Sequence, residues 1–432
     1  MFGTDRRVLV LAFARMADSV ANSFLIVVLP LYIASGAISL DTLVGTHVPI
    51  IGLEITQALL IGIVLSLFGF LNSLAQPFTG RLSDRSGKRK VYILFGLALL
   101  AVASAAYIVV DNYLAIVIIR ALQGIGAAFT IPCTIALVNE LSTTESRGGS
   151  FGVFNAFRLL GFGVGPVVAG SVVVGGPYTL PVRGITLTGF NAAFLIAVVG
   201  ALLSFCLVTI LISDPETTRD SAGEELSIAV WDREGQQLLD PIFSLAVATL
   251  CMAIGIALFA TLQETINARL GQQPWLFGAE FAAVVLANVV FQFPIGRASD
   301  QYGRRPFLLV GFLVLVPSVL AQGLVTTPAG MLIARVIQGV AVAMVFAPGL
   351  ALAGDLAGKG QSGTQLSLLT MAFGLGTALG PLASGYLVRF GFLAPFAFGA
   401  VLAVVGLVLV YSQVGETLPD PDSAADRAVP QD

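Results

Sequence analysis

Charged residues are scarce in this chain of 432 residues, since Asp, Glu, Lys and Arg together make up only 11% of it. A soluble protein of this length would carry about 25% charged residues. Here 56% of the residues are hydrophobic, and apolar runs of about 20 residues recur from one end to the other. The composition excludes an ordinary soluble domain and indicates a protein that crosses the membrane several times.

Cysteine and histidine are also nearly absent. Cys133, Cys206 and Cys251 are scattered through apolar runs, and the one histidine, His47, lies in a predicted loop. This pattern favours small buried or surface side chains over a disulfide framework or a zinc site. Without H-E-x-x-H or a histidine in a predicted helix, the chain lacks the groups of an intramembrane hydrolase. We therefore expect no enzymatic activity, no metal and no cofactor.

The apolar runs predict an all-α membrane protein with twelve transmembrane helices, because lipid admits only helices or closed barrels, and barrel strands span about 10 residues. Between the runs, Lys and Arg gather in the segments on one side, and the other side holds only Arg183, Arg269 and Arg389. By the positive-inside rule both termini are cytoplasmic, in a multi-pass protein of the cell membrane. The expected helices are 8–34, 57–79, 91–110, 113–138, 150–174, 190–213, 241–262, 275–295, 306–325, 328–350, 365–388 and 391–411.

Four features recur in the second half of the chain at an offset of 215 or 216 residues. They are the charged stretch 80–90, repeated at 296–306; Asn72 and Gln76, repeated as Asn288 and Gln292; Arg120 and Gln123, repeated as Arg335 and Gln338; and Gly165-Pro166, repeated as Gly380-Pro381. Six helices followed by six that enter from the same side form a parallel repeat. We predict an N-terminal bundle (1–213), a cytoplasmic linker (214–240), a C-terminal bundle (241–411) and an acidic cytoplasmic tail (412–432).

The charged stretch also carries a family motif, G-x-L-x-D-[RK]-x-G-[RK]-[RK]. Gly80, Leu82, Asp84, Arg85, Gly87, Lys88 and Arg89 match it, and the second copy keeps Gly296, Asp300, Gly303 and Arg304. With the 6+6 repeat, the chain resembles the major facilitator superfamily over nearly its whole length. The resemblance implies alternating access, in which two bundles rock around a central cavity, and we expect a monomer in the lipid bilayer with no nucleic-acid partner.

The resemblance also implies a conformational latch in the charged stretch. Gly80 would let the second helix lie close against the eleventh, and Asp84 would face the start of the eleventh helix near Thr364, with Arg85 as its ion-pair partner. Because the second copy is weaker, the first half would carry most of the latch. The simpler roles are topological: Lys88, Arg89 and Lys90 hold the loop on the cytoplasmic side, and Gly87 permits a tight turn.

A second pattern falls on the fifth predicted helix. Gly152, Gly161, Gly165, Pro166 and Gly170, with Ala169 in place of a glycine, are similar to the antiporter motif of the twelve-helix drug:proton antiporter branch of this family. Small residues let helix backbones approach each other, and proline loosens the local hydrogen-bond ladder. The same pattern would also serve close packing without a role in antiport.

Ionisable residues within the predicted helices are candidates for proton coupling. Arg15, Asp18 and Asn22 are spaced to share one helix face, and Asp18 lies roughly 15 Å into its span. Arg120 heads a fourth-helix motif, and in drug antiporters the matching arginine is thought to take part in proton coupling. We name Asp18 and Arg120 as the proton-coupling pair. The alternative is a permanent pair of Asp18 with Arg15 or Arg120 that only holds the bundle together.

Polar side chains within the helices are the candidates for substrate contact. The set is Arg15, Asn22, Asn72, Gln76, Gln123, Asn155, Arg158, Glu280, Asn288, Gln292 and Arg335. Glu280 lies close to the outer end of its helix and could instead be an interfacial acid. No phosphate-binding loop is present, since Arg89 follows Gly87-Lys88 where Ser or Thr is needed.

These features favour a secondary active transporter that exchanges protons for a lipophilic or cationic small molecule leaving the cell. The alternatives are a proton symporter or uniporter of a small polar or anionic metabolite, and a sensor that keeps the fold without transport.

Overall fold

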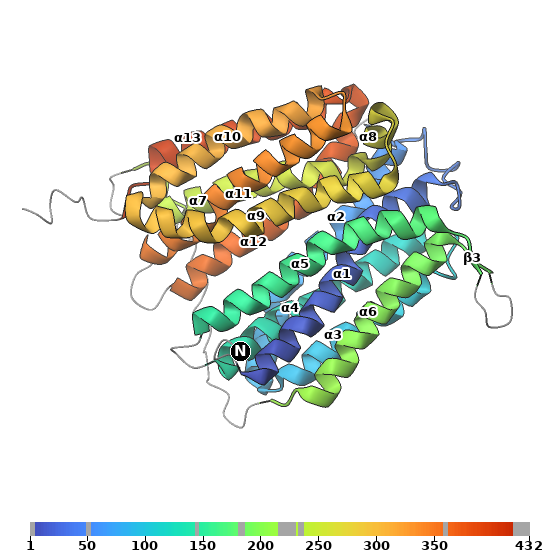
Figure 1. Cartoon of the computed structure of the whole chain (residues 1–432), viewed down its shortest axis with the longest axis horizontal. Coiled ribbons are helices and arrows are strands. Elements are labelled where there is room, and N and C mark those ends of the chain that lie inside the picture. The colour runs from blue at the N-terminus through green and yellow to red at the C-terminus, as the bar shows by residue number, and fades with distance from the viewer. Residues whose placement is uncertain are drawn as a thin grey trace, which may run out of the picture.

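The computed structural model describes residues 5–48, 53–142, 147–179, 186–214, 230–231, 237–356 and 362–417 of the chain. In this part of the chain, twelve helical segments are long and apolar enough to cross a membrane, which confirms the predicted fold class. Most of the predicted linker and tail lies outside the described residues. Figure 1 shows the helices as two bundles lying side by side, the first half of the chain in blue to green and the second in yellow to red.

The first bundle contains α1 (Arg6–Ala34), α2 (Gln57–Ser86), α3 (Arg89–Ala106), α4 (Tyr113–Leu141), α5 (Arg147–Gly175) and α6 (Gly189–Leu211). Two antiparallel hairpins join helices at one end of it. Strand β1 (His47–Val48) pairs with β2 (Leu53–Glu54), with His47 opposite Glu54. Strand β3 (Tyr178–Thr179) pairs with β4 (Thr186–Leu187), with Tyr178 opposite Leu187. His47 is exposed, as predicted.

The second bundle repeats this order. It contains α7 (Pro241–Ala257), the 3-10 turn η1 (Leu258–Leu262), α8 (Gln263–Leu270), α9 (Pro274–Tyr302), α10 (Arg304–Leu324), α11 (Pro328–Leu356), α12 (Ser362–Leu387), η2 (Val388–Phe390) and α13 (Leu393–Gln413). The predicted seventh span ends at residue 262, but the helical path continues through η1 and α8 to Leu270.

Side chains outside the helices define where several helices begin. Thr56 accepts a hydrogen bond from the Leu59 backbone N–H at 3.2 Å, and Asp240 accepts one from the Ile242 N–H at 2.8 Å. These contacts satisfy amide donors that have no partner inside the helix. Prolines such as Pro30 and Pro132 lie inside long helices without ending them, as expected for membrane helices.

The charged stretches at 80–90 and 296–306 are mostly helical, which corrects the predicted ends of two helices. The second span was expected to stop at residue 79 and the eighth at 295, but α2 continues to Ser86 and α9 to Tyr302. Charged side chains at these positions reach solvent or one another, so helix formation costs little there. The turns themselves fall on Gly87 (φ 64°) and Gly303 (φ 100°), which confirms the turn predicted at Gly87.

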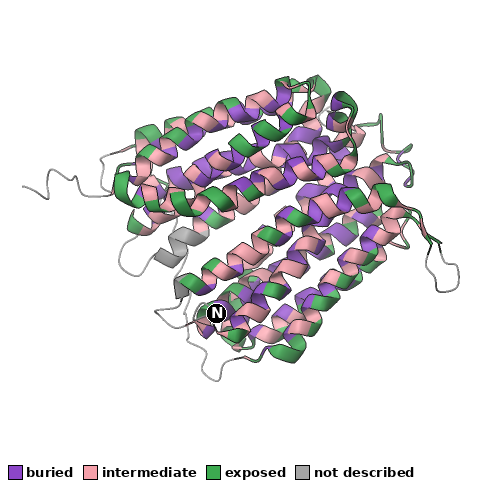
Figure 2. Ribbon diagram, viewed as in Figure 1, coloured by how far each residue is buried: buried purple, intermediate pink, exposed green. Residues whose placement is uncertain are grey.

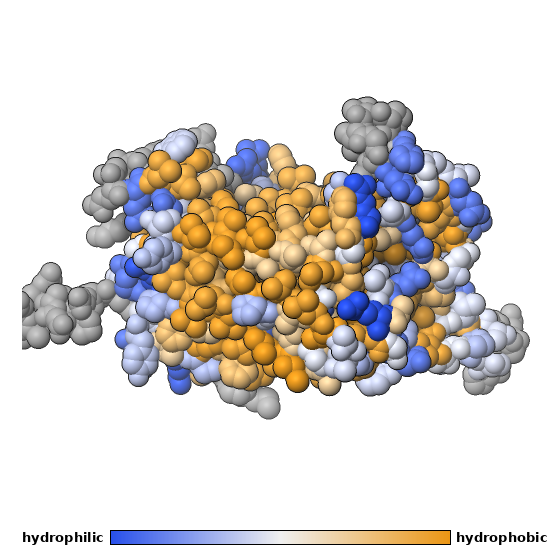
Figure 3. All heavy atoms as spheres, turned by 90° about the horizontal axis from the view of Figure 1, so that it is seen from above, coloured by the Kyte–Doolittle hydropathy of each residue, from blue (hydrophilic) through white to orange (hydrophobic). Residues whose placement is uncertain are grey.

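The surface of the molecule is apolar around its middle. Figure 2 shows buried residues concentrated between the helices, and Figure 3 shows apolar residues covering the centre of one face, with hydrophilic residues towards its two ends. Large side chains such as Val102 (69% exposed) and Ile210 (76%) point outward from α3 and α6. In water this surface would be costly, and its extent fits a surrounding bilayer.

We call the end of the molecule that carries the N-terminus the inner end, and the opposite end the outer end. The bundles meet towards the outer end through α2 with α12 and α5 with α9 (Figure 1). A Cβ added at Gly69 would lie 2.8 Å from the Ala378 Cβ of α12, and one added at Gly170 would lie 2.6 Å from the Trp275 Cα of α9. These backbones approach closely because the residues are glycines.

Towards the inner end the same helices lose contact with the opposite bundle. A Cβ added at Gly152 of α5 or Gly296 of α9 would meet no atom within 4 Å. The latch prediction places Gly80 against α12, but among the described residues the nearest neighbour of an added Cβ at Gly80 is the Pro132 side chain of α4, in its own bundle, at 3.9 Å. The contacts that the described residues of α2 make with α12, such as Gly69 with Ala378, lie nearer the outer end.

Candidate functional site

Asp18 lies inside the first bundle, buried to 95% in the middle of α1. Its carboxylate pairs with the guanidinium of Arg15 one turn earlier, and both side chains are at least 90% buried. The exposed fraction of Asp18 as a whole residue is 5%. A charge at this depth is stable only with a partner or water, and Arg15 supplies the partner.

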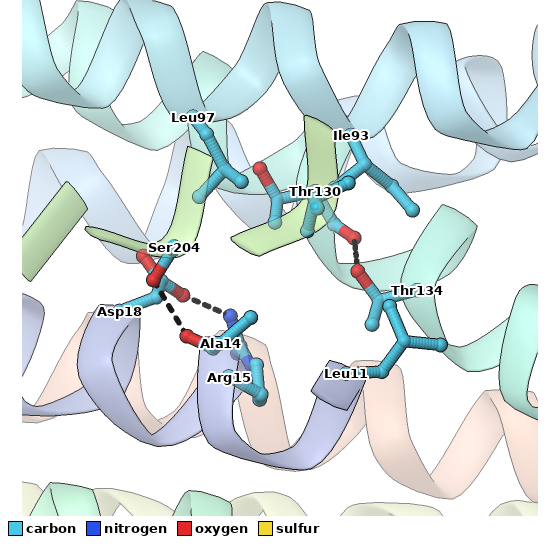
Figure 4. A pocket seen from close by; sticks show the side chains of 10 residues that line it. Leu11, Ala14, Arg15, Asp18, Ile93, Leu97, Thr130, Thr134 and Ser204 are labelled. Carbon is cyan, nitrogen blue, oxygen red and sulfur yellow. Dashed lines mark hydrogen bonds and ion pairs between the residues drawn. The ribbon is translucent and has the colours of Figure 1, made fainter. Parts of the chain in front are cut away.

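Two small cavities lie on either side of Asp18. Arg15 and Asp18 line the first with Thr130, Thr134 and Ser204, and Figure 4 shows these side chains converging from α1, α4 and α6. Asp18 and Asn22 line the second with Ser104 and Gln123, so the three polar positions of α1 share one face, as their spacing predicts. That face is turned towards α3, α4 and α6 of the same bundle.

Arg120 of α4 is 98% buried and makes no ion pair with Asp18 or any other acid among the described residues. Its Nη1 donates to the Gln123 Oε1 at 3.1 Å, and its guanidinium lies 4.5 Å from the centre of the Phe68 ring. Gln123 Oε1 also accepts from the Tyr107 hydroxyl at 3.2 Å, and its Nε2 donates to the Ser104 hydroxyl at 3.0 Å. The predicted pair is therefore not in contact, although Gln123, which bonds to Arg120, lines the second cavity with Asp18.

The second bundle repeats this network on α10 and α11. Arg335 is completely buried; its Nη1 donates to the Gln338 Oε1 at 2.6 Å, and its guanidinium lies 4.2 Å from the centre of the Phe259 ring. Gln338 Oε1 also accepts from the Gln322 Nε2 at 3.1 Å. Arg335 Nε donates to the backbone carbonyl of Glu280 at 3.2 Å, which brings α9 into contact with the network.

The other predicted substrate contacts do not gather around Asp18. Arg158 and Asn155 bond to each other on α5, with Nη2 to Oδ1 at 2.9 Å, and are half-buried. Gln76 donates to the Asn72 side chain at 3.0 Å on α2. On α9, Asn288 and Gln292 are half-buried and lie nearer the inner end than the contact between α5 and α9. These residues lie on helices α2, α5 and α9 that face the opposite bundle, where a substrate would pass.

Asp84 pairs with Arg89 at the start of α3, not with Arg85 as predicted. Successive helical residues point about 100° apart, so Arg85 cannot reach its neighbour and is exposed. Arg89 is 97% buried and also bonds to Glu140 of α4 at 3.0 Å and to the Ser83 hydroxyl at 2.7 Å. Thr364, the predicted position facing Asp84, has a side chain outside the described residues, so that part of the latch stays a prediction.

The second copy repeats these ion pairs, although its acids are more exposed. Arg304 at the start of α10 pairs with Asp300 of α9 at 3.3 Å and with Asp355 of α11. In both copies the next residue donates its backbone N–H to an acid beyond the sixth helix of its bundle: Lys90 to Asp214 at 2.8 Å and Arg305 to Glu416 at 2.9 Å.

Comparison with known proteins agrees with this doubled architecture. The family model described as Major Facilitator Superfamily matches residues 11–262 and again 242–431. The chain belongs to this superfamily. Its relatives there include the human chromaffin granule amine transporter, 23% identical over 87% of this chain and 67% of the relative, and the Staphylococcus aureus quinolone resistance protein NorA, 24% identical over 84% of this chain and 90% of the relative.

A solved structure of the superfamily shares the fold. It is a bacterial homologue of the human lysosomal transporter Spinster, described as inward-facing and occupied, with a TM-score of 0.69, 14% identity and 94% coverage of each chain. The match shows that the two chains share a fold. Members of the superfamily move small molecules across membranes, so this chain is a membrane transporter.

In this facilitator the antiporter-like motif of α5 serves two interfaces. Gly161 and Gly165 pack on the backbone of α1, where a Cβ at Gly165 would lie 2.7 Å from the Val20 carbonyl oxygen. Pro166 and Gly170 pack across the bundles on α9, where a Cβ at Gly278 would collide with the Pro166 backbone. Gly152 makes no such contact. The pattern is used for close packing, and four of its five positions take part.

The sequence prediction missed several residues that complete these networks. Tyr107 and Gln322 bond to the two central glutamines, and Glu140 and Asp355 hold the two inner-end arginines. Each pair is separated by the same offset of 215 residues that relates Arg120 to Arg335. Extending the repeat comparison to every polar residue in a helix would have found them.

Proposed function

We propose that this facilitator is a proton-coupled exporter of a lipophilic or cationic small molecule, working by alternating access as a monomer in the plasma membrane. Asp18 carries the proposal. It is a buried carboxylate in the middle of α1, held by one arginine and flanked by two small cavities with mixed polar and apolar linings. The names of the amine transporter and of NorA support an organic amine or drug as the cargo.

Asp18 can exchange its partner for a proton. When Arg15 moves away, an ionised Asp18 would be left in an apolar bundle, so the loss of the ion pair favours protonation. The hydroxyls of Thr130, Thr134 and Ser204 line the cavity beside it and can hold water on the path of that proton. Proton occupancy would then bias the bundles towards one of two arrangements, and the closed outer end seen here is one of them.

Asp18→Asn tests the proposal in proteoliposomes. We expect the variant to lose accumulation driven by a proton gradient by at least about tenfold and to retain exchange of labelled for unlabelled substrate, because the amide cannot take up or release a proton. Asp111→Asn, which changes an exposed acid before α4, is the matched control and should behave as wild type. Accumulation by Asp18→Asn against a substrate gradient would remove Asp18 from the mechanism.

A second candidate is transport of an anion, because three guanidinium groups within the helices have no acidic partner among the described residues. Arg120, Arg158 and Arg335 make no ion pair with an acid among the described residues. Buried guanidinium groups recognise carboxylates and phosphates through paired N–H donors. The same proteoliposomes distinguish the two: an organic cation that leaves as protons enter supports the exporter, and an organic anion that enters with protons supports the symporter.

A further inference from the structure

Glu280 is a completely buried acid on the second turn of α9, outside the site around Asp18. Its Oε2 accepts a hydrogen bond from the Gln272 Nε2 at 3.0 Å. Gln272 lies in the short connection between α8 and α9, and its Nε2 also donates to the Asn267 side chain at 3.2 Å. The carboxyl group is thus tied to the outer end of the second bundle by an amide and not by a cation.

Two oxygens in this contact have no hydrogen-bond donor. Glu280 Oε1 and Gln272 Oε1 are both buried without a partner. Both are acceptors, so no rotation of the amide alone can satisfy them while the carboxyl is ionised. A proton on Glu280 supplies the missing donor, since a neutral acid donates its O–H to the amide oxygen and accepts the amide N–H. An acid paired in this way carries no buried charge.

Arg335 lies beside Glu280 but does not pair with its carboxyl group. Its Nε bonds to the Glu280 backbone carbonyl, its Nη1 bonds to Gln338, and its Nη2 is buried without a partner. A free guanidinium N–H next to a buried acid would attract an ionised carboxylate strongly. The carboxyl group points to the amide instead, as a neutral acid would.

Among the described residues, no charged group other than Arg335 lies close to Glu280. The side chains of α5 that face this part of α9 are Phe162 and Pro166. Arg158 lies farther towards the inner end, because Gly163 of α5 already faces Leu286, more than one turn past Glu280. The charged residues of α8, Glu264 and Arg269, are exposed, and Arg269 stacks on Phe392. Those of α10, Arg304 and Arg305, lie at the inner end beside Asp355 and Glu416. Arg335 of α11 is the only charged side chain that contacts this part of α9 among the described residues.

We infer that Glu280 is a second proton-binding site of the transporter, occupied while the outer end is closed. When the proton leaves, the carboxylate exchanges Gln272 for the free Nη2 of Arg335. The inference rests on the proposed proton coupling and adds a site in the second bundle. It also links that site to the closure, because Gly278, two residues away, packs on Pro166, and the Phe281 ring lies 5.8 Å from the Phe162 ring of α5.

Trp275 reports on this closure. It begins α9 against Gly170 of α5, and the chain has only one other tryptophan, Trp231. In a Trp231→Phe background, quenching of Trp275 by iodide measures access to the α5–α9 contact without substrate or a proton gradient. Because the residue is already 46% exposed, opening can raise the quenching constant by about twofold at most.

We expect the quenching constant to rise with pH between about pH 5 and 9, the range in which buried carboxyl groups titrate. Glu280→Gln, which keeps the shape of the protonated acid, should hold the constant at its low-pH value throughout. Gln272→Ala removes the partner of the protonated form and should move the transition to lower pH. Glu264→Gln, which changes an exposed acid on α8, is the control and should match the parent.

A Glu280→Gln protein that keeps the parent's pH dependence would overturn the inference, as would a parent whose Trp275 quenching does not change with pH. Elution as a single species and a parent-like unfolding temperature show that the variants are folded. Transport by Asp18→Asn decides the proposed function separately, since the Trp275 measurement needs no transport. If the Asp18→Asn test contradicts the role of Asp18 and the Glu280→Gln test supports that of Glu280, the proton site lies in the second bundle. The reverse result leaves Asp18 as the proton site.

Discussion

The two bundles share a central arginine–glutamine network and differ in where they hold an acid. In the first, Asp18 lies on α1 and pairs with Arg15, away from Arg120. In the second, Glu280 lies on α9 beside Arg335 and pairs with no cation. At the centre of the bundles the repeat has therefore kept one arginine and one glutamine and varied the acids, which are the groups that can carry protons.

Packing shows which residues replaced the acids. Gly165 of α5 packs on the Val20 carbonyl, and its counterpart Gly380 packs on the Ile254 carbonyl, so Asp18 corresponds to Met252 of α7. By the offset of 216 residues, Glu280 corresponds to Val64 of α2. Both replacements are buried and apolar. Each bundle thus has one buried acid that the other lacks, and the two acids lie on different helices.

The largest difference that we expect between matched positions is at the inner end. Arg89→Ala would leave Glu140, 92% buried at its side chain, without a partner, and removing one member of a buried pair costs about 3–5 kcal/mol. Arg304→Ala removes pairs with Asp300 and Asp355, whose side chains are 58% and 37% exposed, and should cost about 1 kcal/mol or less. Thermal unfolding in detergent measures both.

Lys88→Ala is the control for this comparison, because Lys88 is exposed and makes no ion pair within the described residues. It should leave the unfolding temperature unchanged. Equal losses for Arg89→Ala and Arg304→Ala would show that burial does not distinguish the two networks.

Much of this arrangement follows from the sequence, and the failures have physical causes. Hydropathy locates all twelve spans, because lipid tolerates few polar residues in a helix. The predicted partner of Asp84 was wrong, because adjacent residues on a helix point in different directions, whereas Arg89 at the start of α3 lies within reach of Asp84. The partner of Asp18 stayed open between Arg15 and Arg120, because the spacing within α1 says nothing about the distance to α4. The contact of Glu280 with Gln272 depends on how α8 turns into α9, which no periodicity encodes.

A second comparison tests the close packing that the bundles have in common. Gly161 of α5 faces the Met16 backbone, and Gly376 of α12 faces the Leu250 carbonyl oxygen at 2.6 Å from an added Cβ. Gly161→Ala and Gly376→Ala should each cost about 2 kcal/mol or more, because the neighbouring atoms are backbone and cannot move aside. Gly152→Ala on the same α5 meets no atom within 4 Å and should be neutral or slightly stabilising. A loss of stability in only one of these two variants would contradict equivalent packing of the two bundles.

The smallest expected effect concerns how α1 and α7 begin. Asp5 accepts from the Arg7 backbone N–H at 2.8 Å and also pairs with the Arg7 guanidinium, and the side-chain hydrogen bond from Arg7 lowers the pKa of Asp5. Asp240 caps α7 through the Ile242 and Phe243 N–H groups, with no arginine in that first turn. Replacing either by Ala should cost about 1 kcal/mol at neutral pH, the usual value of such a cap.

Asparagine separates the cap from the charge, because its side-chain oxygen still accepts the backbone N–H. Asp240→Asn should leave the stability unchanged, and Asp5→Asn should lose only the part of the stability that comes from the ion pair with Arg7. Because the pKa of Asp5 is lower in the folded state than in the unfolded chain, its ion pair stabilises the protein above about pH 4. This stabilisation is lost as the pH falls through the pKa of the folded state. The difference between Asp5→Asn and wild type should therefore shrink in acid. Unfolding temperatures that differ equally at neutral and acidic pH would assign the effect of Asp5 to the cap alone.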